Sequence, residues 1–227
     1  IVDPEPLVVV GLEGVDDLES IARTHDGAIY VLASQSASKS GKRRAERRQF
    51  LRLALRDGSL HLDGRLLLFD RLRDAPPGLR AALRVDLELE SLDIEGMAAD
   101  GDGLLLGLKA PAALASGTPL WTLPNPVAAF AAPALQPADL ALLGMASLAV
   151  VADGRRVAGG VADLLVLPDG SLLVAATASG IDPAHQEGVI VRLRRPLDAS
   201  PPELLHRFPG DKPEGLAISA EPGRFVA

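Results

Sequence analysis

Three glutamates occupy the same place in a short pattern that returns along the chain. The pattern is an acidic residue, a small residue, an apolar residue and Ala, with copies that begin at Glu19, Glu95 and Glu214. A degenerate copy has Ala162 in the glutamate position and carries its carboxylate one step later, at Asp163. Carboxylates that a fold gathers together can bind a hard cation such as Ca²⁺, or can raise one another's pKa for acid–base chemistry.

A structural role is also open for these carboxylates. Each one could accept hydrogen bonds from the backbone of the neighbouring repeat, with Gly96 and Gly215 allowing the close approach. If the role is metal binding, the expected ion is Ca²⁺ and the expected ligands are Glu19, Glu95 and Glu214.

The turns that follow the pattern predict β-hairpins. An Asp-Gly pair and an apolar run come after the first two copies, at residues 26–33 and 102–108. Asp-Gly between apolar runs is a strong hairpin signal, because tight hairpin turns need positive φ. The chain has six such pairs, which begin at Asp26, Asp57, Asp63, Asp102, Asp153 and Asp169.

One complete unit can be traced through these hairpins, with expected strands at residues 18–23, 28–34, 49–55 and 60–69. A repeated meander of four strands is typical of a β-propeller blade. We therefore predict an all-β chain, a single β-propeller domain over residues 1–227 with four-stranded antiparallel blades. The blades are expected to start near residues 17, 92, 161 and 213, and the last one is cut off, so the propeller is incomplete as given.

Two further details and one alternative belong to this prediction. A strand at residues 7–12 is expected to complete the last blade, and short helices are expected at residues 77–84 and 137–143. Trp121 is expected to pack between blades. A β-sandwich is the competing architecture for a chain of many short strands.

Blade geometry predicts where the polar residues meet. The first strand of a blade lines the central channel, and the second strand returns to the face where the first began. Glu19 and Glu95 should therefore lie at one mouth of the channel, together with Lys109 and residues 34–36, which follow the second strands.

A basic loop is expected at the same mouth. Six of the ten residues from 39 to 48 are basic. They could attract an anion, with arginine side chains forking onto phosphate or carboxylate, or they could form a solvated loop. The six are Lys39, Lys42, Arg43, Arg44, Arg47 and Arg48, of which Lys42, Arg43 and Arg44 are the predicted ligand-binding residues.

Composition excludes several classes of function. The net charge of −7 argues against general nucleic-acid binding, and the absence of Cys excludes disulfides and thiolate metal sites. The most apolar stretch, residues 127–151, is interrupted by Pro133, Pro137 and Asp139, so no membrane span is expected. Both the cytoplasm and the periplasm remain open as compartments.

Six stretches of the chain carry a resemblance to other proteins: residues 18–22, 38–48, 92–98, 105–111, 161–164 and 212–217. Together they resemble a bacterial family, the one called domain of unknown function 3616. The resemblance covers most of the chain and implies a β-propeller-like domain without an assigned reaction. More distantly, the chain is similar to phytase-like esterase and gluconolactonase-type propellers, which hold a divalent cation at the channel mouth. The sequence departs from those enzymes because its only Asn is Asn125.

The expected function is binding of a small anionic or metal-bridged ligand at one mouth of the channel. The predicted binding residues are Glu19, Glu95, Asp163, Glu214, Lys109, Lys42, Arg43 and Arg44. Two alternatives stay open: a Ca²⁺-dependent hydrolase of phosphoesters or lactones, and a protein-interaction scaffold.

Overall fold

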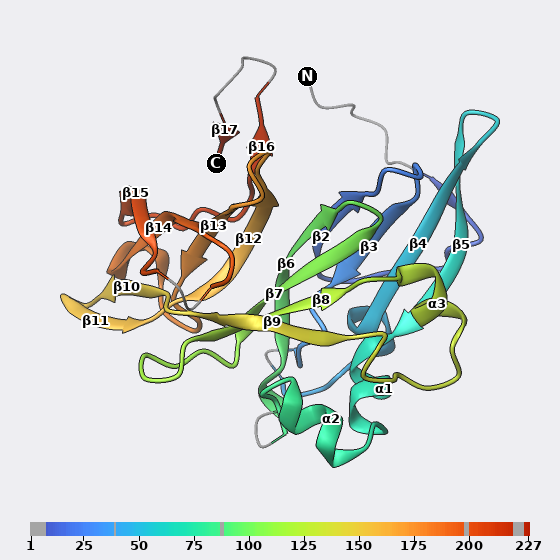
Figure 1. The fold of residues 1–227 in the computed structure, drawn as a ribbon, viewed down its shortest axis with the longest axis horizontal. Helices are drawn as coiled ribbons and strands as arrows, with labels where there is room; N and C mark the ends of the chain where they lie inside the picture. The colour runs from blue at the N-terminus through green and yellow to red at the C-terminus, as the bar shows by residue number, and fades with distance from the viewer. Residues whose placement is uncertain (1–7, 39, 87–88, 198–199, 220–224) are drawn as a thin grey trace.

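The protein is mainly β-structure. The computed structural model describes residues 8–38, 40–86, 89–197, 200–219 and 225–227. Within these residues the strands form four open sheets, with three short α-helices between them (Figure 1). The all-β prediction is confirmed at this level, whereas the described strands do not close into a ring.

Two four-stranded meanders follow one another between Leu18 and Ala146. In the first sheet the strands are β2 (Leu18–Arg23), β3 (Ile29–Ala33), β4 (Gln49–Arg56) and β5 (Ser59–Leu67), each antiparallel to the next. The second sheet repeats this order with β6 (Asp93–Asp100), β7 (Gly103–Ala110), β8 (Thr118–Leu123) and β9 (Ala141–Ala146).

The third sheet has the same meander with an added hairpin. Its strands are β12 (Gly160–Val166), β13 (Leu172–Thr177), β14 (Gln186–Leu193) and β15 (Glu203–Pro209). The hairpin of β10 (Ala149–Ala152) and β11 (Arg155–Ala158) joins this sheet through β14. A last hairpin pairs β16 (Ala217–Ile218) with β17 (Phe225–Val226).

Helices connect the strands at the edges of the first two sheets. α1 (Leu68–Arg73) and α2 (Pro77–Ala82) follow β5, and α3 (Pro126–Ala131) lies between β8 and β9. Single 3₁₀ turns are found at η1 (Ala45–Arg48), η2 (Leu89–Ser91) and η3 (Pro183–His185). The predicted helix at residues 77–84 is confirmed.

The Asp-Gly pairs form the expected turns in four of the six places, and in a fifth the turn consists of Gly101 and Asp102, because Gly103 already begins β7. Asp57-Gly58 and Asp153-Gly154 have positive φ at both residues, which is the backbone of a type I′ hairpin turn. Asp63 is the exception, because it is the extra residue of a β-bulge inside β5. Arg52 and Arg56 hold its carboxylate there, at 3.2 and 2.5 Å.

The apolar core lies between neighbouring sheets. β7 is buried on both faces: Leu104 and Leu106 pack toward the first sheet, and Leu105 packs toward the third. This follows from the period of two in a strand, which points successive side chains to opposite faces. Trp121 is fully buried in the core between the first and second sheets, as predicted.

The first strands of the three large sheets pack against one another in series. β2 contacts β6, and β6 contacts β12. Each of these strands carries a β-bulge near its start, and the extra residues are Glu19, Glu95 and Ala162. The recurring sequence pattern therefore marks a recurring backbone irregularity.

Two predicted elements are wrong. The N-terminal strand, β1 (Val9–Val10), pairs in parallel with β5 at the outer edge of the first sheet and does not complete the last unit. Residues 137–143 do not form a helix, because β9 begins at Ala141 and pairs with β8. The fourth predicted strand also ends early, since α1 begins at Leu68.

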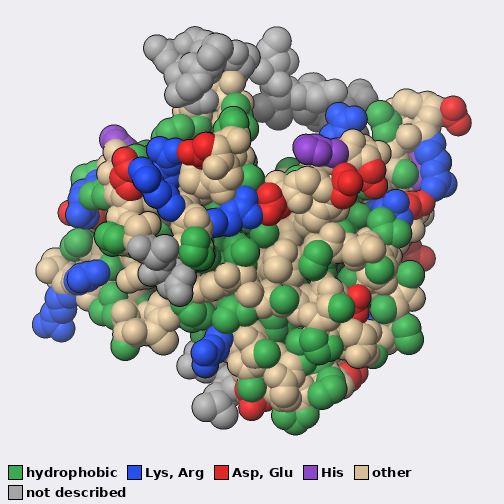
Figure 2. Space-filling view, viewed as in Figure 1, with side chains coloured by type: hydrophobic (Ala, Val, Ile, Leu, Met, Phe, Trp, Pro, Cys, Tyr) green, Lys and Arg blue, Asp and Glu red, His purple; other side chains and the backbone are tan. Residues whose placement is uncertain are grey.

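Surface charges of both signs are mixed. On the face that Figure 2 shows, Lys and Arg side chains alternate with Asp and Glu side chains, so neither sign forms one large patch. On this face, attraction of a charged ligand would therefore come from a local site rather than from the field of the whole face.

A glycine at the bulge sets the distance between the second and third sheets. A Cβ added to Gly96 would lie 2.7 Å from Cγ1 of Val161, so Gly96→Ala should destabilise the fold by about 1–3 kcal/mol. Gly78→Ala is the matched control, because its Cβ would meet nothing within 4 Å and alanine favours the helix of α2. Urea denaturation measures both; equal midpoints for Gly96→Ala and the wild type would contradict the close packing.

Candidate functional site

Two opposing β-bulges aim a glutamate and a lysine at each other. Glu95 is the extra residue of a bulge on β6, and Lys109 is the extra residue of a bulge on β7, across the same strand pair. Lys109 Nζ donates to Glu95 Oε2 at 2.7 Å, and the lysine side chain is only 2% exposed. Burial lowers the pKa of Lys109, although the Glu95 carboxylate opposes that shift.

Glu19 lies beside this ion pair and holds a proton. Burial, the Glu95 carboxylate and the carboxylates of Asp17 and Asp93 raise the pKa of Glu19 to about 8, and a hydrogen bond with Asp17 adds to the shift. Asp17 itself forms an ion pair with Arg47. Near neutral pH the Glu19 side chain is therefore mainly a carboxylic acid that can donate a hydrogen bond.

Asp93 is the second carboxyl group with a raised pKa. Burial and the neighbouring Glu95 carboxylate raise the pKa of Asp93 to about 7, whereas the Lys109 ammonium lowers it. Its Oδ1 atom is buried and has no hydrogen-bond partner in the part of the chain that is described. A buried carboxylate oxygen without a partner is unusual in a folded protein and is more common at functional sites.

The last unit brings a second lysine to the same place. Lys212 Nζ donates to Glu214 Oε1 at 2.6 Å, and the lysine side chain is 25% exposed. Burial lowers the pKa of Lys212, but the Glu214 hydrogen bond and the carboxylates of Glu95 and Glu19 outweigh it and raise the pKa. We call Asp17, Glu19, Asp93, Glu95, Lys109, Lys212 and Glu214 the charged cluster.

The charged cluster brings the three recurring glutamates near one another. Glu19, Glu95 and Glu214 come from three separate hairpins, and the first two interact directly, while Glu214 joins them through Lys212. Sequence reasoning missed Asp17, Asp93 and Lys212. Each stands two residues before a recurring glutamate, so a charged residue at that offset was the signal that could have found them.

Asp163 has a structural role. Its Oδ1 accepts from the backbone N–H of Leu164 at 2.8 Å and its Oδ2 from that of Leu216 at 2.7 Å, which ties the third sheet to the last unit. Burial raises the pKa of Asp163 to about 6, against the effect of these two hydrogen bonds. Ser20 links the first sheet to the second in a similar way, because its hydroxyl donates to the backbone carbonyl of Glu95.

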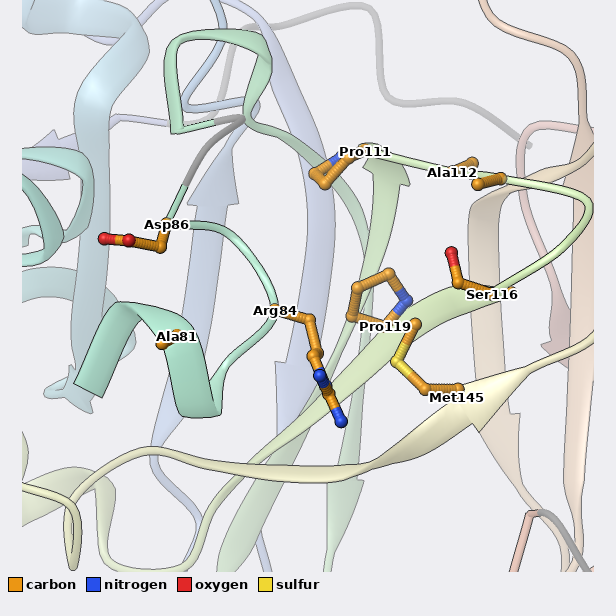
Figure 3. Close-up of a pocket in the computed structure, with 10 residues that line it drawn as sticks. Ala81, Arg84, Asp86, Pro111, Ala112, Ser116, Pro119 and Met145 are labelled. Atoms are coloured by element: carbon orange, nitrogen blue, oxygen red, sulfur yellow. The ribbon is translucent and has the colours of Figure 1, made fainter. Parts of the chain in front are cut away.

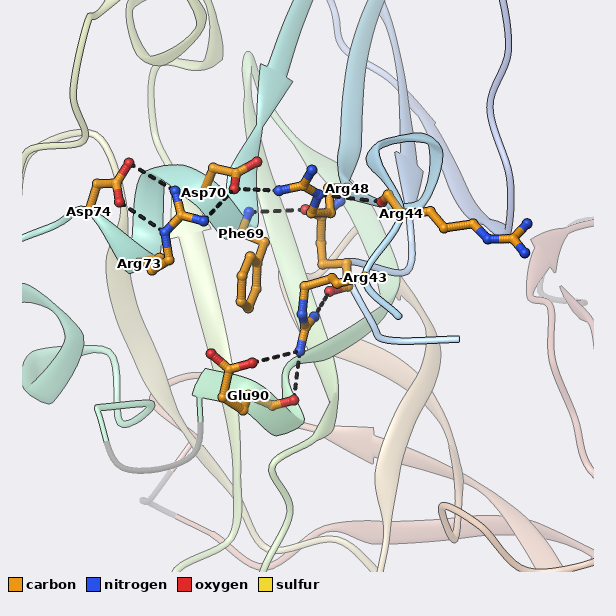
Figure 4. Close-up of polar contacts among 9 residues, drawn as sticks. Arg43, Arg44, Arg48, Phe69, Asp70, Arg73, Asp74 and Glu90 are labelled. Atoms are coloured by element: carbon orange, nitrogen blue, oxygen red, sulfur yellow. Dashed lines mark hydrogen bonds and ion pairs between the residues drawn. The ribbon is translucent and has the colours of Figure 1, made fainter. Parts of the chain in front are cut away.

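Arg43 is also used by the fold, contrary to its predicted role as an anion-binding residue. Its guanidinium donates to the Gln35 and Glu90 carbonyls and lies 3.8 Å from the centre of the Phe69 ring (Figure 4). Arg48 is similarly bound to Asp70 at 2.5 Å. These arginines fasten the basic loop to α1 and η2.

The rest of the basic loop is divided between exposed and buried positions. Lys42 and Arg44 are exposed, and the Arg44 side chain extends away from the network in Figure 4. Gln35, expected at the mouth, is fully buried and bonds to the backbone of Ala33, Gln49 and Phe69. Lys39 lies outside the described residues.

The carboxylates are not gathered as a metal site. No group of three Asp, Glu or His side chains in the described ranges has the arrangement that a metal ion needs. Two of the three expected ligands, Glu95 and Glu214, are instead held by lysine ammonium groups. A bridging Ca²⁺ would therefore have to displace at least one lysine.

A pocket of about 380 Å³ lies next to Lys109, between the second and third sheets. Its walls include Ser91, Gly160 and Ser179, at the edge where β12 begins and β13 ends. Gly160 is required there because a Cβ would overlap the backbone carbonyl of Lys109. Among the described residues of the charged cluster, Lys109 alone contributes to the wall of this pocket.

No protein-family model matches the chain, and no curated protein matches it. The resemblance to the domain of unknown function 3616 family therefore stays a prediction. None of the helices in the described part of the chain has the length and apolar character needed to cross a bilayer.

The proton on Glu19 should make stability depend on pH. The unfolded chain loses this proton near the ordinary pKa of 4.5, whereas the folded chain keeps it up to about 8. The folded state binds more protons in this window, so its stability falls as pH rises through it. Glu19→Gln, which mimics the protonated acid, should flatten this fall and be more stable than the wild type above pH 8. Thermal melts across this pH window measure both effects; parallel curves would contradict the raised pKa.

Proposed function

We propose that this chain is part of a β-propeller whose channel mouth, at the charged cluster, binds a small anionic ligand. Three successive four-stranded meanders with first strands packed in series support the propeller architecture. The observation that carries the function is the convergence of charged residues from three separate repeats around Glu95.

The charge balance of the cluster favours an anion. Arg47 neutralises Asp17, and Lys109 neutralises Glu95, so these charges are already paired. Glu19 and Asp93 hold protons in much of the neutral range and then act as hydrogen-bond donors.

Lys212 is the cation that an incoming ligand can reach. Its partner Glu214 is 68% exposed, so Glu214 can turn into solvent without leaving a buried charge behind. An anion can then take its place on Lys212.

Proton-linked calorimetry tests the proposal and separates an anion from a metal-bridged anion. Sulfate, which keeps its charge between pH 6 and 8, should bind more tightly as pH falls, because protonation of Glu19 and Asp93 removes repulsion. Lys212→Met should weaken sulfate binding about 10-fold or more through loss of a charge-assisted hydrogen bond. Arg155→Met, on the exposed hairpin β10–β11, should not.

A metal-bridged ligand would behave in the opposite way. Sulfate would then bind only with Ca²⁺ present, and Ca²⁺ itself would bind more tightly as pH rises, because it competes with protons for the carboxylates. Flat traces for sulfate with and without Ca²⁺ would overturn the proposed function.

The raised pKa values of Glu19 and Asp93 favour a second candidate, a hydrolase for phosphoesters or lactones. Glu19 would protonate the leaving group, and Asp93 in its carboxylate form would accept a proton from the attacking water.

This candidate predicts turnover in a panel of phosphomonoesters and lactones. Glu19→Gln should lower kcat at least about 100-fold without lowering the melting temperature, because the amide has no proton to give. The wild-type rate should fall as pH rises above about 8, where Glu19 ionises. A panel without turnover would leave binding as the function.

A further inference from the structure

A second pocket, of about 460 Å³, lies apart from the charged cluster, between the end of α2 and the loop that joins β7 to β8 (Figure 3). Its walls are mainly apolar and include Ala81, Pro111, Pro119 and Met145. None of the residues of the charged cluster lines it. Its volume is within the usual range for small-molecule sites, about 300–1,000 Å³.

The guanidinium of Arg84, which lines this pocket, is free to bind a ligand. Arg84 extends toward Pro119 and Met145 in Figure 3, and its guanidinium has no hydrogen bond or ion pair with any residue that the structure describes. The other charged residue of the wall, Asp86, accepts from Arg80 Nε at 3.0 Å and is therefore neutralised. The pocket thus presents a single uncompensated positive charge beside apolar walls.

The backbone at Arg84 is unfavourable for an arginine. α2 ends in a Schellman motif, with Arg84 N–H bonded to the Ala81 carbonyl at 3.1 Å and Val85 N–H to the Arg80 carbonyl at 3.0 Å. Arg84 occupies the position with positive φ, at 64°, where glycine is the usual residue. An arginine here lowers stability, so its presence calls for another role.

The core fixes where this arginine begins. Trp121 Nε1 donates to the carbonyl of Leu83 at 2.9 Å, and both of these side chains are fully buried. The peptide that enters Arg84 is therefore held in place before any ligand arrives, which reduces the entropy that binding would cost.

We propose that this pocket binds a small carboxylate with an apolar body. The Arg84 guanidinium receives the carboxylate through its two parallel donors. The apolar body packs on Pro119 and the Met145 thioether, which adapts to varied shapes. A single free cation suits a monoanion better than a phosphate dianion.

The two methionines of the chain make the test selective. Met145 lines the pocket, whereas Met97 is 2% exposed in the core between the sheets. With ¹³C-methyl methionine labelling, benzoate and hexanoate should shift the Met145 signal saturably and leave Met97 unchanged. Benzamide, the neutral analogue of benzoate, should bind at least about 10-fold more weakly because it lacks the charge that Arg84 recognises.

Arg84→Gly is the decisive variant, because it should raise thermal stability and at the same time abolish benzoate binding. Glycine relieves the left-handed backbone, so the melting temperature should rise by about 2–4 °C, while the benzoate-induced shift of Met145 should be lost. Arg84→Lys should retain weak binding, since it keeps the charge but not the fork. Benzoate binding that survives Arg84→Gly, or equal affinity for benzoate and benzamide, would overturn the proposal.

Discussion

The ion pair between Lys109 and Glu95 connects the backbone irregularities of this fold to the chemistry of its charged cluster. Both residues are the extra members of bulges on one strand pair, so neither side chain follows the ordinary alternation of a strand. The lysine is almost completely buried, and removing one partner of such a pair would leave an uncompensated charge away from water. The pair must therefore form whenever β6 and β7 form. The position of this ion pair then influences the pKa values of the neighbouring carboxyl groups of Glu19 and Asp93.

The raised pKa of Glu19 is a consequence of that position. The Glu95 carboxylate stays next to Glu19 because Lys109 holds it there, and burial removes the water that would screen the repulsion. Asp163 lies in another copy of the recurring pattern, and no charged side chain in the described part of the chain contributes to its pKa. Two backbone N–H groups bond to it, and it fastens one unit to the next. The recurring pattern thus contains two uses of a carboxylate: Glu95, the extra residue of its bulge, pairs with Lys109, whereas Asp163, one step after the extra residue Ala162, bonds to the backbone.

Strand positions could be predicted well from the sequence, because Asp-Gly turns and apolar runs are local signals. The positions of β2, the turns at Asp57 and Asp153, and the convergence of Glu19 with Glu95 all follow from them. The failures involve contacts that local signals do not encode. β1 pairs in parallel with a strand about 50 residues away, and Arg43 bonds to the carbonyl of Glu90, 47 residues along the chain. Positive charge in a loop could be read from the sequence, but whether the fold itself uses that charge could not.

The difference between arginines that bond within the fold and an arginine that does not is relevant to both proposed sites. In the basic loop, Arg43 and Arg48 bind carbonyl and carboxylate oxygens of the fold, so a ligand would have to compete with existing partners. Arg84 has no such partner among the described residues, and the backbone that carries it would be more stable with glycine. A residue that lowers stability and whose charged group forms no hydrogen bond or ion pair with the described residues is best explained by an interaction outside the folded chain, because folding alone would favour its replacement. The same reasoning applies to Asp93, whose buried Oδ1, beside the ion pair of Lys109, has no partner within the described ranges. In both places the unsatisfied group, rather than the most charged segment, marks where a ligand can stabilise the protein.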